Sequence, residues 1–344
     1  MINNEPLQEF NQCFQDQKSD FSLQQMIEKL DQYKHASTFS VNLNKKQIGD
    51  LGAKQLGDSI SHFQSINSFQ IQLEENEIGN NGCIFLAQGI AQCLKLISIK
   101  INLNDNLISD IGAQALIEGI LANTNMRYLS IHIENNQITD FTIQKLNNLT
   151  SSQVLNIIKL ELILCDNAIS DKGAQNLGRA FRNCENISSL VISLNDNQLT
   201  ENGVLLLAQQ IPFMKNLISL NLSFVNCNLT DFVPEKFGEI FFACRKLSLI
   251  SLNMGFNNLG CIGIHKLGEW LLKNKNLEFI KLILWMNFIR DVGIIQLAKS
   301  LNKSEKMYSI SLNVFDNKVT EFGTNKARQI LQKSKRAVNC QLTN

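Results

Sequence analysis

Residues 99–116 read IKINLNDNLISDIGAQAL, and the pattern of this stretch returns along most of the chain. Ile99, Ile101 and Leu103 alternate with polar residues, which predicts a strand with one buried face. After Asn106 the apolar spacing changes to that of one helical face, at residues 113, 116 and 120. The stretch therefore predicts a strand, a turn at the asparagine and a helix.

The asparagine recurs about every thirty residues and anchors ten repeats, numbered here 1 to 10. Eight of the ten anchors are Asn, and the exceptions are Lys46 and Cys227. The residue two places after each anchor is always aliphatic, and glycine stands six places after it in eight copies. The anchors are residues 46, 76, 106, 136, 167, 197, 227, 257, 287 and 317. A self-similar period of this length is typical of a solenoid.

The phrase I-x-I-x-L-x-x-N-x-I-x-D-x-G-A-x-x-L resembles the leucine-rich repeat, specifically the long ribonuclease-inhibitor type, with about ten 30-residue copies over roughly residues 36–335. The resemblance implies an α/β solenoid shaped as a horseshoe, with a curved parallel sheet on the concave face and helices on the convex face. A further apolar position ten residues before each anchor predicts a longer strand than the family has. The asparagine side chain is expected to satisfy buried backbone groups at the turn, and Ser109 and Asp110 to cap their own helix.

Three segments are expected. Residues 1–35 form an N-terminal segment whose part 21–34, FSLQQMIEKLDQYK, reads as an amphipathic capping helix. Residues 36–335 form the repeat domain, and residues 336–344 form a closing strand because apolar residues alternate there.

Composition excludes several classes of function. A net charge of +1 argues against binding nucleic acid through bulk electrostatics. No apolar run approaches the length of a membrane span, so no membrane insertion is expected. The N-terminus lacks the pattern of a signal peptide, and the nine cysteines show no zinc spacing. These features predict a cytoplasmic protein with reduced thiols.

No catalytic motif is found, and the expectation is that the protein is not an enzyme. There is no phosphate-binding glycine loop and no nucleophile elbow, and the four histidines lie in different repeats. His132 is expected beside Glu134 as a surface residue. A column of acids could supply a general acid and base or a cation site, but a solvated edge is the favoured interpretation. The column comprises Glu74, Glu75, Asp105, Glu134, Asp166 and Asp196. Catalytic residues, cofactors, metal sites and a small-molecule substrate are therefore not expected.

The outward strand and turn positions change character along the chain. In repeats 1–4 they are polar or charged, whereas from repeat 7 onward many are apolar, as in LILWMNF at 282–288. A contiguous apolar patch on a protein surface usually marks an interface. The predicted partner-binding residues are Val225, Leu249, Phe256, Phe279, Ile283, Trp285, Met286 and Phe315. Local packing of these side chains is the open alternative. For Trp270, between the helices, core filling and binding stay equally open.

These observations predict a non-catalytic protein-interaction scaffold or assembly subunit. It would dock a protein partner, within a larger complex, on the apolar C-terminal half of its concave face. The alternative is a regulator of an enzyme, acting through the same face in the manner of a GTPase-activating protein or ribonuclease inhibitor. The composition, rich in Asn, Gln, Ile and Lys, suits an AT-rich genome such as that of a ciliate, and in such a cell a cytoskeletal or ciliary complex is expected.

Overall fold

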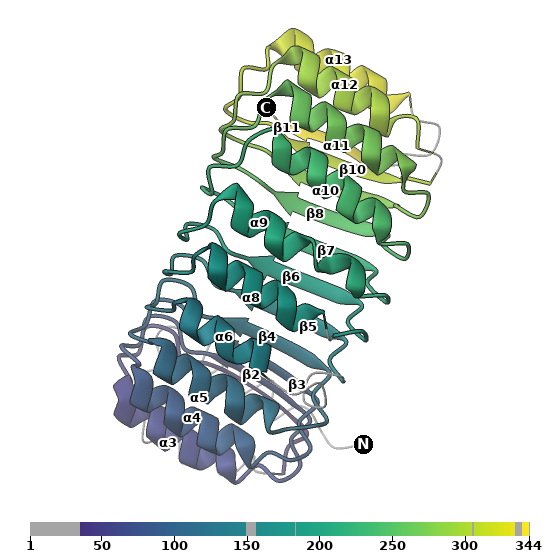
Figure 1. Ribbon diagram of the computed structural model, residues 1–344. Helices are drawn as coiled ribbons and strands as arrows, with labels where there is room; N and C mark the ends of the chain where they lie inside the picture. The colour runs from purple at the N-terminus through teal and green to yellow at the C-terminus, as the bar shows by residue number, and fades with distance from the viewer. Residues whose placement is uncertain (1–34, 149–155, 183, 305, 334–338, 344) are drawn as a thin grey trace. The chain divides into compact units, whose positions relative to one another are not determined.

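A computed structural model describes residues 35–148, 156–182, 184–304, 306–333 and 339–343. The chain divides into two compact units, unit 1 (Met1–Asn167) and unit 2 (Ala168–Asn344). In each unit the strands form one layer and the helices form a second layer beside it (Figure 1). The expected capping helix at 21–34 and the loop at 149–155 lie outside the described residues.

Unit 1 alternates strands and helices in chain order, and each strand pairs in parallel with the next. Equivalent residues of neighbouring repeats lie side by side, so Ile71 lies beside Ile101 and Ile101 beside Ile131. The described elements are β1 (Thr38–Asn42), α3 (Gly49–Ser61), β2 (Ser68–Gln72), α4 (Asn80–Ala91), β3 (Ser98–Asn102), α5 (Asp110–Leu121), β4 (Tyr128–His132), α6 (Asp140–Asn148) and β5 (Lys159–Ile163).

Unit 2 repeats the same alternation, and its described strands β6 to β11 are also paired in parallel in chain order. A strand stands at the expected C-terminal position. The described elements are α8 (Asp171–Phe181), β6 (Ser189–Ser193), α9 (Glu201–Ala208), the 3-10 turn η1 (Ile211–Phe213), β7 (Ser219–Ser223), α10 (Phe232–Ala243), β8 (Leu249–Asn253), α11 (Cys261–Lys273), β9 (Phe279–Ile283), α12 (Asp291–Leu301), β10 (Ser309–Asn313), α13 (Glu321–Gln332) and β11 (Asn339–Thr343).

The core of each repeat lies between its strand and its helix. Ile99 and Ile101 of β3 face Leu116 and Ile120 of α5, and all four are at most 1% exposed. The prediction of a longer strand is wrong, because every described strand has five residues. The apolar residue ten places before the anchor, such as Leu96, is fully buried but belongs to the turn that precedes the strand.

The anchor asparagines form a ladder of hydrogen bonds between repeats, as the sequence predicted. The Asn106 Oδ1 accepts from the backbone N–H groups of Asn76 and Ile78 at 3.2 and 2.9 Å. Its Nδ2 donates to the carbonyls of Leu73, Leu103 and Asn104 at 2.9, 3.0 and 2.9 Å. The side chain thus satisfies five backbone groups of two repeats, which would otherwise be buried without partners.

The residue four places after the anchor is an acid in eight repeats, and in several of them it caps the helix of the following repeat, as Asn80 does in repeat 2. The Asp50 Oδ1 accepts from the N–H groups of Gly79 and Gly82 at 2.7 and 2.9 Å. Asp110 likewise accepts from the next repeat, and Ser109 makes no side-chain cap bond to its own helix. The expectation of a Ser or Thr cap three places after the anchor is confirmed at Ser170, Thr200 and Thr320 and is wrong at Ser109. The expectation that the acid caps its own helix is wrong, because the Asp110 carboxylate reaches sideways to the neighbouring helix terminus.

This lateral cap explains the glycine six places after each anchor. A Cβ at Gly82 would lie 2.6 Å from the Asp50 Oδ1, so a larger residue would displace the carboxylate. In repeat 4 the glycine is replaced by Thr142, whose hydroxyl donates to Asp110. In repeat 7 the preceding acid is the longer Glu201, which bonds Thr230 instead, and valine is tolerated at 233.

The repeated strands, asparagine ladders and lateral caps make each unit an α/β solenoid of the leucine-rich-repeat kind. The ribonuclease-inhibitor type and the segment boundaries remain predictions. No helix among the described residues combines the length and apolar character needed to cross a bilayer.

Candidate functional site: an aromatic ridge at the turns of unit 2

The residue before each anchor adopts a left-handed backbone conformation in all ten repeats, with φ between 49° and 61°. This conformation is unfavourable for side chains other than Gly, Asn and Asp. Asn or Asp stands there in six repeats, and a charged Lys or Glu stands there in repeats 1 and 2. The ten residues are Lys45, Glu75, Asp105, Asn135, Asp166, Asp196, Asn226, Phe256, Met286 and Asp316.

Phe256 and Met286 depart from this chemistry. Both are bulky and apolar, with φ of 51° and 49°, yet their side chains are 47% and 40% exposed. The strained backbone is therefore not offset by burial of the side chain. Strain of this kind concentrates at binding and catalytic sites. Two adjacent repeats thus carry an unfavourable backbone and an exposed apolar group at the same place.

Trp285 completes this feature by stacking on Phe256. The ring centroids lie 6.4 Å apart and the planes differ by 9°, an offset stacked pair. Gly255 makes the stacking possible, since a Cβ there would lie 2.4 Å from the indole Cε2. The indole is consequently half-buried, with one side on the Gly255 backbone.

Two further aromatic residues extend the surface to the neighbouring turns. Phe315 is 58% exposed, and Phe288, just after the anchor Asn287, is 52% exposed. The Lys318 Nζ lies 5.1 Å from the centroid of the Phe288 ring. We call the group Phe256, Trp285, Met286, Phe288 and Phe315 the turn ridge. Sequence reasoning missed Phe288 because its position is polar or small in most repeats.

The remaining predicted partner-binding residues contribute less exposed surface than expected. Val225 is only 8% exposed, so the expectation that it faces solvent is wrong. Val225 follows the end of β7, and its N–H donates to the Asn195 Oδ1 at 2.8 Å. Leu249, Phe279 and Ile283 are half-buried on the outer face of β8 and β9. The turn ridge is therefore narrower than the predicted patch and lies closer to the strand ends.

A second exposed apolar row was missed. It stands five residues after the anchor, at the starts of the helices of repeats 7 to 10, and exposed Leu51, Ile111 and Phe141 take the same place in unit 1. All four side chains of repeats 7 to 10 are at least half-exposed: Phe232, Ile262, Val292 and Phe322.

Trp270 lies between helices α10 and α11. A Cβ at Gly238 would be 2.5 Å from the Trp270 Cβ, and the Trp270 ring lies 5.8 Å from that of Phe242. The Lys273 Nζ stands 3.7 Å from the indole centroid. These contacts favour the packing interpretation of Trp270.

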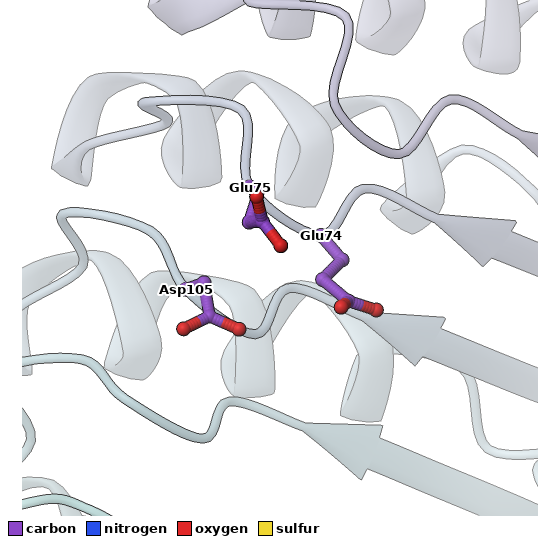
Figure 2. A group of neighbouring side chains, drawn as sticks. All are labelled: Glu74, Glu75 and Asp105. Atoms are coloured by element: carbon purple, nitrogen blue, oxygen red, sulfur yellow. The ribbon is translucent and has the colours of Figure 1, made fainter.

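The acidic column of unit 1 brings three carboxylates together. Ligand atoms of Glu74, Glu75 and Asp105 lie within 4.8 Å of one another (Figure 2). Each already has a partner: Glu75 pairs with the Lys45 Nζ at 2.7 Å, and Glu74 accepts from the Asn102 amide at 3.1 Å. The Asn135 amide donates to Asp105 at 2.6 Å. The arrangement matches a hydrogen-bonded, solvated edge.

His132 pairs with Glu161, not with the expected Glu134. The His132 Nε2 lies 3.3 Å from the Glu161 Oε1, and the Ser130 hydroxyl donates to Oε2 at 2.9 Å. The hydrogen bond from His132 and then that from Ser130 lower the pKa of Glu161 to about 2, against the opposing effect of burial. Glu134 shows the opposite shift, since burial and then Asp166 and Asp105 raise its pKa.

We expect the Glu161 contacts to stabilise unit 1 above pH 4.5 and to be lost as the pH falls towards 2. The folded pKa lies below the unfolded value of about 4.3, so protonation of Glu161 removes native interactions. In Glu161→Gln, unfolding free energy should drop by about 1 kcal/mol at pH 7, after allowance for solvent screening, and the difference should vanish near pH 2. Thermal melts across this range test it, with exposed Glu118→Gln as control. A constant difference at all pH values would refute the assignment.

The buried thiols have low chemical reactivity. Burial raises the pKa of Cys93 to about 11 and that of Cys244 to about 12. Both remain protonated at neutral pH, and a thiol in that state is a poor nucleophile and metal ligand.

No protein-family model matches the sequence, and no curated protein matches it. Solved structures similar to the chain include an internalin from Listeria monocytogenes, at 15% identity over 99% of this chain and 95% of that chain, with a TM-score of 0.37. Another is leiomodin-1 actin-binding site 2, at 15% identity over 44% and 82%, with a TM-score of 0.35. Both scores are low, so the fold is assigned from this chain's own repeats.

Proposed function

We propose that the protein is a protein-interaction scaffold or assembly subunit that binds its partner on the turn ridge of unit 2. The observation that carries this proposal is that Phe256 and Met286 combine a left-handed backbone conformation with exposed side chains, at a position where the other repeats have polar residues. Retaining such residues costs stability, and binding energy from a partner is a physical reason to retain them.

The composition of the ridge also supports a protein partner. Aromatic residues and Met are enriched in the energetic centres of protein interfaces. The Trp285 ring packs on Gly255 and stacks on Phe256, so these two side chains would lose less entropy on binding than unsupported ones. A regulator of an enzyme acting through this surface, a larger complex and a cytoplasmic location remain predictions.

The test is the double variant Phe256→Asn with Met286→Asp. Both new residues suit the left-handed conformation, so we expect the unfolding free energy to rise by about 0.5–1 kcal/mol per site. Partner recovery by affinity capture and quantitative mass spectrometry should fall at least about tenfold, since ridge side chains are the expected hot spots.

The matched control is Glu75→Asn with Asp196→Asn, which changes two left-handed turn residues away from the ridge. This control should retain every partner of the natural chain. If the ridge variant is stable and recovers the same proteins in the same amounts, the proposed site is wrong.

A further inference from the structure

The near-zero net charge conceals opposite charges on the two units. Residues 1–167 contain 11 Lys and Arg against 18 Asp and Glu, whereas residues 168–344 contain 21 against 13. Unit 1 therefore carries a net charge of −7 and unit 2 one of +8. An asymmetry of this size biases which partners approach each unit.

The charges around the turn ridge are mainly positive. Lys281 projects from β9 and is exposed, and Arg290 and Lys318 are exposed beside the ridge on adjacent repeats, where their backbones form an isolated parallel bridge. Among the described turn residues of repeats 8 to 10, Asp316 is the single acidic residue. Because Lys318 lies over the exposed ring of Phe288, a cation and an apolar group are presented together.

We infer that the turn ridge binds an acidic protein segment that carries at least two large apolar side chains. This inference rests on the proposed function and specifies its partner. Apolar anchors would cover the Phe256–Trp285 stack and the exposed side chains of Met286 and Phe288, and carboxylates between them would meet Lys281, Arg290 and Lys318.

The corresponding turns of unit 1 would repel the same segment. Glu75, Asp105 and Asp166 occupy the positions that Phe256 and Met286 take in unit 2, with Glu74 and Glu134 beside them. The raised pKa of Glu134, caused by burial and then by neighbouring carboxylates, is consistent with a negative potential there. Like-charge repulsion therefore confines an acidic segment to unit 2.

A protein segment fits the surroundings of the ridge better than an anionic membrane does. The outer strand positions next to the ridge hold half-exposed Ser251, Asn253, Ser311 and Asn313. The Oδ1 atoms of Asn253 and Asn313 already accept from the Gly255 and Phe315 N–H groups. The side-chain donors of these four residues can be satisfied by the backbone carbonyls of a peptide, which hydrocarbon cannot offer. Trp285 is stacked and half-buried, so it is poorly placed to insert into lipid.

The experiment is selection of a displayed random 12-residue peptide library on the full chain. We expect the enriched peptides to carry two or more large apolar residues and an excess of Asp and Glu. Fluorescence anisotropy of the enriched peptides should show binding at least about fivefold weaker at 300 mM than at 50 mM salt, because exposed charges are screened. Lys281→Glu with Lys318→Glu should weaken binding at least about tenfold, whereas Lys45→Glu with Lys100→Glu in unit 1 should not.

The outcomes separate this inference from the proposed function. Enriched peptides that are apolar but neutral or basic, and that are lost on Phe256→Asn with Met286→Asp, would overturn the acidic partner and leave the ridge as a binding site. Equal enrichment on that ridge variant would overturn both. The inference would also be overturned if the chain sedimented with phosphatidylserine vesicles, or self-associated in analytical ultracentrifugation, and the ridge variant abolished that behaviour.

Discussion

Replacing Asn257 by alanine should destabilise unit 2 by about 3–5 kcal/mol, since several buried backbone groups would lose their partner at once. The Asn257 Oδ1 accepts from the N–H groups of Cys227 and Leu229, both at 3.0 Å. Its Nδ2 donates to the carbonyls of Phe224 and Gly255 at 2.8 and 2.9 Å. The side chain is 6% exposed, so water cannot readily replace these bonds.

The neighbouring residue supplies the control. Asn258 has the same side chain but is exposed, so Asn258→Ala should change the unfolding free energy by less than about 0.5 kcal/mol. Urea denaturation gives the free energies, and hydrogen exchange locates the loss to repeats 7 and 8. If Asn257→Ala cost no more than Asn258→Ala, the ladder would not be a main source of stability.

Replacing Gly323 by alanine should cost about 2 kcal/mol, and removal of the Asp291 carboxylate should reduce that cost by more than half. A Cβ at Gly323 would lie 2.1 Å from the Asp291 Oδ1, so the carboxylate must move. Asp291 would then lose its bonds to the Thr320 N–H and hydroxyl, both at 2.7 Å. Hydrogen bonds to a charged group contribute about 1.5–3 kcal/mol, and the better helix propensity of alanine recovers up to about 1 kcal/mol.

A double-mutant cycle makes this prediction specific. In the Asp291→Ala background the carboxylate is gone and only the contact with the Cβ of residue 291 at 2.9 Å remains, so Gly323→Ala should cost less than about 1 kcal/mol. Chemical denaturation of the four proteins gives the coupling energy. Equal costs of Gly323→Ala in both backgrounds would show that the glycine is needed for another reason.

The repeat made the fold predictable. Each copy contains the same pattern of strand, turn and helix, so an element misassigned in one copy is corrected by comparison with the others. The asparagine column also predicted the ladder, because a buried amide between parallel strands has few other uses. The extended strand was wrong because Leu96 and its equivalents are buried by the turn, and an apolar residue at alternate spacing does not by itself show strand backbone.

The lateral caps were not predictable from local pattern. Asp50 stands one residue after the place where an N-cap is expected, so the sequence suggests a cap for its own helix. Its carboxylate instead accepts from the N–H groups of Gly79 and Gly82, which lie 29 and 32 residues further along the chain. Only the lateral packing of neighbouring helices brings these groups together, and a repeat read in isolation carries no sign of it.

The candidate site was predicted in part. The apolar character of Phe256, Trp285, Met286 and Phe315 was visible against the polar residues of earlier repeats, but exposure depends on the neighbouring turn. Val225 is buried, and Trp285 is half-buried because Gly255 leaves room for its ring. The strain at Phe256 and Met286 is visible only in their backbone φ angles. The frequent Asn and Asp at the same position of other repeats was the sequence signal for a left-handed conformation there.

The lateral caps also decide where this chain can be recombined. An acid in one repeat and the residue 32 positions later form a matched pair: Asp50 with Gly82, and Asp110 with Thr142. A graft that separates such a pair would place a side chain against a foreign carboxylate or leave a helix end uncapped. Repeats 6 and 7, which combine Glu201 with Val233, should therefore be transplanted together, whereas copies with Asp and Gly can be exchanged, deleted or multiplied singly.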